Sequence, residues 1–267
     1  MLDAFRLYLR YAAISIRGQL QYRASFALQT VGHLVTTAIE FLGIWALFER
    51  FGSLAGWRLG EVALFYGIAD VTFAFSDSLS RGLDNFGATV KAGDFDRILL
   101  RPRSTILQLL GEELTLKRVG RLTQGAVVLI WASRAADIDW SIGKAALLAA
   151  SIAGGVCLFI GLNVLQATSA FWTTETLEIW NAFTFGGNYA SQYPLPIYRP
   201  WFRRFFTFVV PLACINYLPG IAILGRPDPL GVPIVAGWLA PLAGALFLGI
   251  SLAIWRFGVR HYLSTGS

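Results

Sequence analysis

The chain has 267 residues, of which 55% are apolar and 14% are charged, and its mean hydropathy is +0.57. A soluble domain carries about 25% charged residues, so this composition excludes a globule with a charged surface. Because a spanning helix needs about 20 apolar residues, the chain can form six such helices and has no room for a separate soluble domain. The net charge of +6 fits cationic loops of a membrane protein, so we expect no nucleic-acid partner.

The first 24 residues predict an amphipathic helix that lies on the membrane. Apolar residues recur at helical spacing from Leu2 to Leu20, and Arg6, Arg10 and Arg17 form a second stripe beside them. We expect residues 1–24 to lie at the interface, with the arginine side chains reaching the lipid headgroups. The alternative is a frayed cytosolic tail.

The apolar runs that follow predict a single all-α transmembrane domain over residues 25–267. The third span is expected to be one long helix whose first half lies at the interface, because charged residues precede its short apolar run. The fifth is expected to be interrupted at Pro211 and Pro219, since proline removes a helix hydrogen bond. The six expected spans are residues 25–48, 62–79, 104–132, 144–172, 205–224 and 231–255.

The cations are unevenly distributed over the segments that these spans separate. Fourteen of the 22 lysines and arginines fall in the two termini and in the second and fourth loops, and five fall in the other three loops. Cytoplasmic loops collect Lys and Arg, so both termini are expected to be cytoplasmic. The fourth loop, which carries Arg199, Arg203 and Arg204, would lie on the same side.

The sequence contains no recognisable set of residues for catalysis or cofactor binding. Its Gly-Lys pair, residues 143–144, is not followed by Ser or Thr, so the chain has no P-loop for ATP. The two histidines, His33 and His261, are far apart, and the two cysteines form no cluster, so no metal site is expected. We therefore expect a chain that is not an enzyme and that holds no cofactor of its own.

Several ionisable residues fall inside the expected spans, where lipid makes them costly. His33 and Glu40 are seven residues apart, Asp70 and Asp77 repeat this spacing in the second span, and Arg81 follows four residues later. Each set therefore lies on one helix face. Either these faces line a translocation route or a seam between subunits, or the charges pair inside the bundle, with Asp77 and Arg81 satisfying each other.

The segment VKAGDFDRILLRPRS, residues 90–104, is the most specific feature of the sequence. Gly93 permits a sharp bend, Asp94 can cap a short helix, and Pro102 can open the next helix near its first turn. Apolar residues at positions 95, 98 and 99 give the short helix an apolar edge. Such a helix on the cytoplasmic side indicates a docking element, and the alternative is a helix resting on headgroups.

Two regions of the sequence resemble the permease subunits of ABC type 2 transporters. They are the run GDFDRILLRP at residues 93–102, and the segment 193–219 with its YPL, VP and NYLP motifs. More narrowly, the chain resembles a bacterial branch of six-span permeases whose genes usually adjoin those of an ATPase and of a second permease. The resemblance extends from about Tyr22 to the end and implies a multi-pass protein of the bacterial inner membrane.

In that family the loop between the second and third spans carries the coupling helix, which implies the same role for residues 93–102. We expect Phe95 to be the apolar anchor on the ATPase, and Arg97 and Arg101 to be polar contacts. The coupling residues inferred from the resemblance are Gly93, Asp94, Phe95, Asp96, Arg97, Leu99, Arg101 and Pro102.

The resulting interpretation is a permease that forms a translocation path with a second copy or with a homologous permease. Two separate ATPase subunits would bind ATP and Mg, and would drive rocking of the permease halves between two states. Members of the family are mostly exporters, so export is the expected direction, and the substrate is not fixed. The alternative is an ion-coupled secondary transporter that uses Glu40, Asp70 or Asp77 as its ion site.

Overall fold

The computed structural model describes residues 13–14, 16–19, 21–112, 118–173 and 177–262. This part of the chain is helical and holds no strand, apart from an isolated bridge between Leu54 and Trp57. The all-α prediction is confirmed. Residues 13–14 and 16–19 are helical, and the rest of the predicted interfacial helix up to residue 20 lies outside the described residues.

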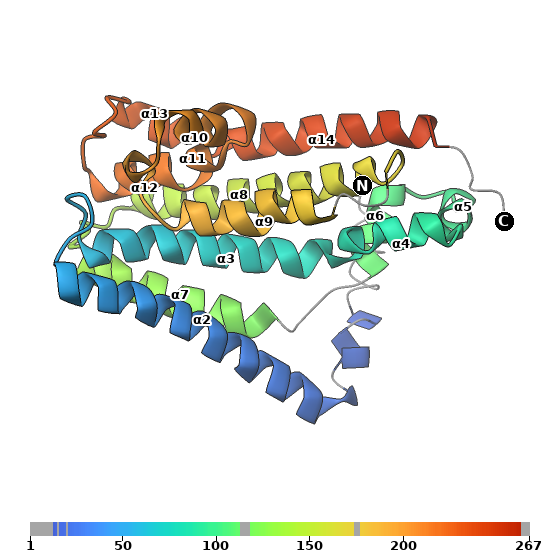
Figure 1. The fold of residues 1–267 in the computed structure, drawn as a ribbon, viewed down its shortest axis with the longest axis horizontal. Helices are drawn as coiled ribbons and strands as arrows, with labels where there is room; N and C mark the ends of the chain where they lie inside the picture. The colour runs from blue at the N-terminus through green and yellow to red at the C-terminus, as the bar shows by residue number, and fades with distance from the viewer. Residues whose placement is uncertain (1–12, 15, 20, 113–117, 174–176, 263–267) are drawn as a thin grey trace.

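Four long helices run along the length of the molecule (Figure 1). Each holds an apolar stretch long enough to cross a bilayer. They correspond to the first, second, fourth and sixth predicted spans, although the sixth starts later than predicted because Pro241 precedes its first residue. The four helices are α2 (Arg23–Phe51), α3 (Leu59–Asp84), α8 (Ile142–Ser169) and α14 (Leu242–Arg260).

Short helices gather at the two ends of this bundle (Figure 1). One end, here called the α5 end, holds α4 (Phe86–Lys91), α5 (Asp94–Leu99) and α6 (Thr105–Glu112). The opposite end, called the α12 end, holds the loop between α2 and α3 together with several short helices. These are η2 (Leu195–Ile197), α10 (Pro200–Arg204), the π-helix η3 (Phe205–Val209), α11 (Leu212–Ile215), α12 (Tyr217–Leu224) and α13 (Ile234–Leu239).

The third predicted span, residues 104–132, is wrong as a single helix. It is replaced by α6 and by α7 (Val119–Ala135), with residues 113–117 outside the described part of the chain. α6 packs against α3 and α5, whereas α7 packs along α3 and α2. Lipid disfavours the charged residues that separate the two helices in the sequence, which explains why one continuous spanning helix is not formed.

The fifth predicted span, residues 205–224, is not one helix either. The helices on the two sides of Pro211 are bent by 71°, and Val210 before it is extended, as the residue preceding a proline prefers. Pro211 therefore breaks the segment as predicted. Pro219 does not, because it lies in the first turn of α12, where a missing N–H costs no helix bond.

A further helix, α9 (Leu177–Ser191), occupies part of the predicted fourth loop. It packs against α3 and α8 and leads from the α5 end back toward the α12 end (Figure 1). Arg199, Arg203 and Arg204 consequently lie at the α12 end, opposite the place that the cation count assigned to them. Moving these three arginines reduces the difference in the number of cations between the two sides of the predicted topology from 14 against 5 to 11 against 8.

Glycines allow the closest approaches between helices. A methyl group on Gly244 of α14 would overlap the Gly154 backbone of α8, and one on Gly154 would overlap the Pro241 carbonyl. Gly67 of α3 meets the backbone of Leu129 in the same way. These contacts join α8 to α14, and α3 to α7, with backbone against backbone.

Gly244→Ala should therefore destabilise the protein by about 1–3 kcal/mol, the usual cost of overpacking. Gly249→Ala on the same helix is the matched control, because nothing lies within 4 Å of the added carbon. The measurement is the midpoint of thermal unfolding in mild detergent, compared with wild type. Equal shifts for the two variants would contradict the packing described for α8 and α14.

Candidate functional site

Three carboxylates occupy one face of α3 at intervals of seven residues: Asp70, Asp77 and Asp84. Seven residues are nearly two helical turns, so the three side chains form a row along the helix. We call this row the aspartate ladder. Each carboxylate forms an ion pair with an arginine, and Asp70 is fully buried.

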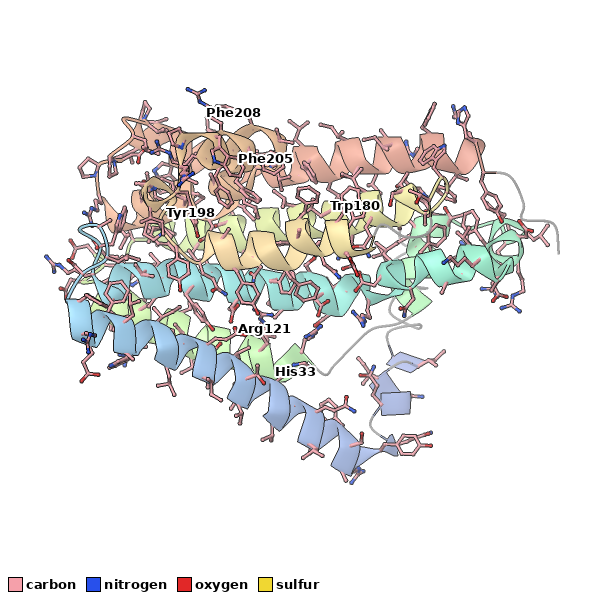
Figure 2. The ribbon with its side chains drawn as sticks, viewed as in Figure 1. His33, Arg121, Trp180, Tyr198, Phe205 and Phe208 are labelled. Atoms are coloured by element: carbon pink, nitrogen blue, oxygen red, sulfur yellow. The ribbon has the colours of Figure 1, made fainter. Side chains whose placement is uncertain are left out.

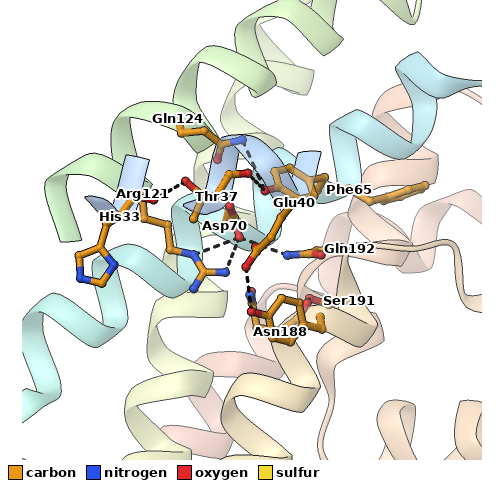
Figure 3. A network of polar contacts seen from close by, with 12 residues as sticks. His33, Thr37, Glu40, Phe65, Asp70, Arg121, Gln124, Asn188, Ser191 and Gln192 are labelled. Atoms are coloured by element: carbon orange, nitrogen blue, oxygen red, sulfur yellow. Dashed lines mark hydrogen bonds and ion pairs between the residues drawn. The ribbon is translucent and has the colours of Figure 1, made fainter. Parts of the chain in front are cut away.

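The innermost pair joins α3 to α7 (Figure 3). Arg121 donates from Nε and Nη2 to Oδ1 of Asp70, at 3.2 and 2.9 Å. The Arg121 side chain is 6% exposed, and its guanidinium lies 5.0 Å from the centre of the Phe73 ring. Both charges are thus removed from solvent and depend on each other for solvation.

α9 supplies amide groups to the same pair. Gln192, just beyond its last turn, donates to Asp70 Oδ1 at 3.2 Å. The Asn188 amide fits best with its oxygen 3.0 Å from Arg121 Nη2 and its nitrogen 3.1 Å from the Ala69 carbonyl. The two amides surround the ion pair with further dipoles, so α9 is a wall of the site although the sequence analysis treated it as a loop.

A second group of polar contacts brings in α2. The Tyr66 hydroxyl donates to the Thr37 carbonyl at 3.2 Å and accepts from Gln124 at 3.4 Å. Tyr189 of α9 donates to Glu40 Oε1 at 3.1 Å. Four helices, α2, α3, α7 and α9, therefore meet around one polar network (Figure 3).

The predicted pathway residues of α2 differ in their positions. Glu40 is half-buried and belongs to the network through Tyr189. Figure 2 labels His33 on α2 and Arg121 near it. In the close view of Figure 3 the His33 imidazole lies on the far side of Arg121 from Asp70. His33 takes part through its backbone carbonyl, which accepts from the Thr37 hydroxyl at 2.9 Å, whereas Glu40 takes part through its carboxylate.

The outer two pairs of the ladder correct a predicted contact. Asp77 pairs with Arg118, the residue just before α7, and Arg81 pairs with Asp84 at 2.7 Å. The expected pair of Asp77 with Arg81 is therefore wrong, because α7 brings a cation to Asp77 from across the bundle. Extending the seven-residue spacing by one more step would have identified Asp84 from the sequence.

The predicted coupling helix is present as α5. Gly93 precedes it in the left-handed conformation, with φ of 73°, which glycine adopts without strain. Asp94 is the first helical residue and not the predicted cap, because Gly93 takes the cap position and no side chain of the described residues caps the helix. Asp96 lies half-buried within the helix. Pro102 does not open the next helix, because α6 begins only at Thr105.

Phe95 faces the interior of the protein, so its predicted role as an anchor on a partner is wrong. It is fully buried, and its ring lies 5.0 Å from Phe86, 5.0 Å from Tyr262 and 6.3 Å from Trp255, measured between centroids. Phe171 completes this group at 5.4 Å. We call these five rings the aromatic cluster; they fasten α5 to α4, α8 and α14.

The exposed surface at the end of α5 consists of other residues. Leu100 is 85% exposed and Leu99 is 38% exposed. The Arg97 side chain is 73% exposed and lies 3.4 Å from Asp94, and Arg101 is exposed beside them. Leu100, which directly follows the last residue of α5, was not among the residues predicted from the sequence.

Comparison with known proteins identifies the family of the chain. A family model described as ABC-2 family transporter protein matches residues 34–266. No curated protein and no solved structure matches the chain. The matched range includes the aspartate ladder, α5 and the aromatic cluster.

Arg121→Met should lower the stability by about 3–5 kcal/mol, because it leaves the Asp70 charge buried without a partner. The double variant Asp70→Leu with Arg121→Met should recover most of this loss, since it removes both charges. Arg134→Met, an exposed arginine of the same helix, is the control. Thermal unfolding of the four proteins tests the pair, and a double variant no more stable than Arg121→Met would contradict it.

Proposed function

The chain belongs to the ABC-2 family of transporters, and on that basis we propose that it is the permease subunit of an ABC transporter. It forms the translocation path together with a second copy or a homologous permease. Two separate ATPase subunits dock at the α5 end and supply the energy, with ATP and Mg bound on those subunits. Export is the direction proposed from the resemblance described above.

The observation that carries this proposal is the construction of α5. This short helix is held in the protein by Phe95, while Arg97, Leu99 and the following Leu100 are exposed to the exterior. A large apolar side chain that is 85% exposed, beside exposed cations, is suited to binding another protein. A helix that merely rested on headgroups would not need such a rigid attachment.

The attachment also gives α5 a mechanical connection to the polar site. Phe86, whose ring belongs to the aromatic cluster, is the first residue of α4. Only one residue separates α4 from α3, and α3 carries the aspartate ladder. Trp255 and Phe171 connect the same cluster to α14 and to the end of α8. A displacement of α5 by a closing ATPase would therefore be transmitted to α3, α8 and α14 together.

The polar network supports a path or seam between α2 and α9. Tyr189 is 45% exposed and Glu40 is half-buried, so the network opens to the surface between these helices. Lipid contact with a carboxylate at such a depth is costly. We infer that a second permease or a water-filled route covers Glu40 in the assembled transporter.

The pairing of the carboxylates argues against the alternative of an ion-coupled transporter. Two of its three candidate sites, Asp70 and Asp77, each form an ion pair with an arginine. An ion carrier needs a carboxylate that can bind and release the ion during the cycle, and the paired arginine already occupies that position. ATP-driven transport makes no such demand on these residues.

We propose that the α5 end is cytoplasmic and that the chain crosses the bacterial inner membrane six times. The crossings are α2, α3, α7, α8, α9 and α14. α7 and α9 have 17 and 15 residues, or about 26 and 23 Å, against about 30 Å of hydrocarbon. The bent segment from α10 to α12 lies at the α12 end, where it would cover the part of the bilayer thickness that the short α9 does not reach.

Leu100→Ser should weaken the complex with the ATPase by at least about tenfold, which corresponds to about 1.4 kcal/mol, because a buried leucine contributes more than that. Ile142→Ser, which alters a residue that is 92% exposed at the α12 end, should have no effect. Phe95→Ala should instead lower the thermal stability of the permease alone. Co-purification of the ATPase with each variant is the measurement, and unchanged binding by Leu100→Ser would refute the docking site.

The orientation can be tested with single cysteines in a chain whose Cys157 and Cys214 are replaced by alanine. Ser53→Cys, at the exposed α12 end, should react with an impermeant thiol reagent in cells whose inner membrane is intact. Leu100→Cys should react only after the membrane is permeabilised. The reverse pattern would place the α5 end outside.

A further inference from the structure

A long groove lies between α6, α8 and α14 at the α5 end, apart from the aspartate ladder. Its volume is about 660 Å³, within the range of about 300–1,000 Å³ typical of ligand sites. Leu248 and Leu252 of α14, Ile160 of α8 and Leu107 of α6 form an apolar wall. The groove therefore offers an apolar surface that no part of the described chain covers.

Three arginines border the same groove. Arg103 precedes α6, and Arg256 and Arg260 lie in the last turns of α14. All three are exposed, and within the described residues none of them forms an ion pair. The described lining of the groove includes no carboxylate, so its polar end favours an anion.

The dimensions match one leaflet of a bilayer. From Arg260 to Leu248 the groove follows α14 for twelve residues, or about 18 Å. Half of the hydrocarbon core is about 15 Å thick. Cations are thus placed at the level of the headgroups when the leucines lie at the level of the acyl chains.

We propose that this groove binds one anionic phospholipid from the leaflet at the α5 end. The phosphate is held by Arg103, Arg256 and Arg260, as in basic pockets between transmembrane helices that bind anionic headgroups. An acyl chain lies on Leu248 and Leu252. A zwitterionic lipid is disfavoured because its ammonium group would lie among three cations.

The bound lipid would also support the aromatic cluster. Trp255 lines the groove, belongs to the cluster around Phe95, and donates to Thr105 Oγ1 at 3.1 Å. A lipid in the groove therefore contacts both α6 and α14 next to Trp255, and it would stabilise the packing of the aromatic rings that hold α5. This role does not depend on ATP hydrolysis, so lipid binding and ATPase docking can fail independently.

The test is to reconstitute the full chain in vesicles of equal amounts of phosphatidylglycerol and phosphatidylcholine, extract it in mild detergent, and quantify the retained lipids by native mass spectrometry. Wild type should retain about one phosphatidylglycerol per chain in preference to phosphatidylcholine. Arg103→Gln with Arg256→Gln and Arg260→Gln should reduce that retention at least about tenfold. Equal retention of the two lipids by wild type would overturn the proposal.

A matched control carries the same number of substitutions at the α12 end: Arg199→Gln, Arg203→Gln and Arg204→Gln. This control variant should retain as much phosphatidylglycerol as wild type. If it loses as much as the groove variant does, the lipid is retained by the overall positive charge and not by the groove. Leu248→Trp keeps all three arginines and should still reduce retention, because it fills the apolar part. Circular dichroism establishes that each variant is folded, and a folded arginine variant that retains the lipid overturns the assignment.

Discussion

Lipid cannot solvate an ion, and in this fold that constraint acts most strongly on Asp70 and Arg121. The carboxylate is fully buried and the guanidinium nearly so, which makes separation of the two groups expensive. The pair fixes the rotation of α7 relative to α3, because a shift of α7 by one residue would turn Arg121 through about 100°. Arg118 and Asp77 repeat the contact two turns along α3, so the register of the two helices is set at two points.

The long apolar helices were predictable from the sequence, and the polar partners were not. Composition and hydropathy suffice for α2, α3 and α8, since each is a long apolar run. The partner of Asp77 depends on which helix lies opposite, and a spacing of four residues within α3 made Arg81 look adequate. α9 escaped prediction because its glycines, Asn188 and Thr184 resemble a loop, although the amide and hydroxyl groups face a buried ion pair or the helix backbone.

In the candidate coupling element, too, the local backbone was predictable from the sequence, whereas the tertiary contacts were not. Gly93 and the short helix after it follow from local chemistry, because glycine tolerates the left-handed turn that starts α5. Which side of that helix faces inward is decided by aromatic rings from three other segments, Phe86, Phe171 and Trp255. A pattern of apolar positions cannot distinguish a residue that anchors the helix from one that reaches a partner. Phe95, predicted to reach a partner, anchors the helix instead, and the exposed Leu100 was not predicted at all.

The hydrogen bond between Glu40 and Tyr189 has a consequence for motion. Interhelical hydrogen bonds in membranes contribute on average about 0.6 kcal/mol, so on its own this contact would be broken in roughly a quarter of the molecules at equilibrium. The ion pair of Asp70 and Arg121 has no comparable freedom. The contact between α2 and α9 at this hydrogen bond is thus easily broken by thermal motion, whereas the ion-paired contact of α3 with α7 stays fixed.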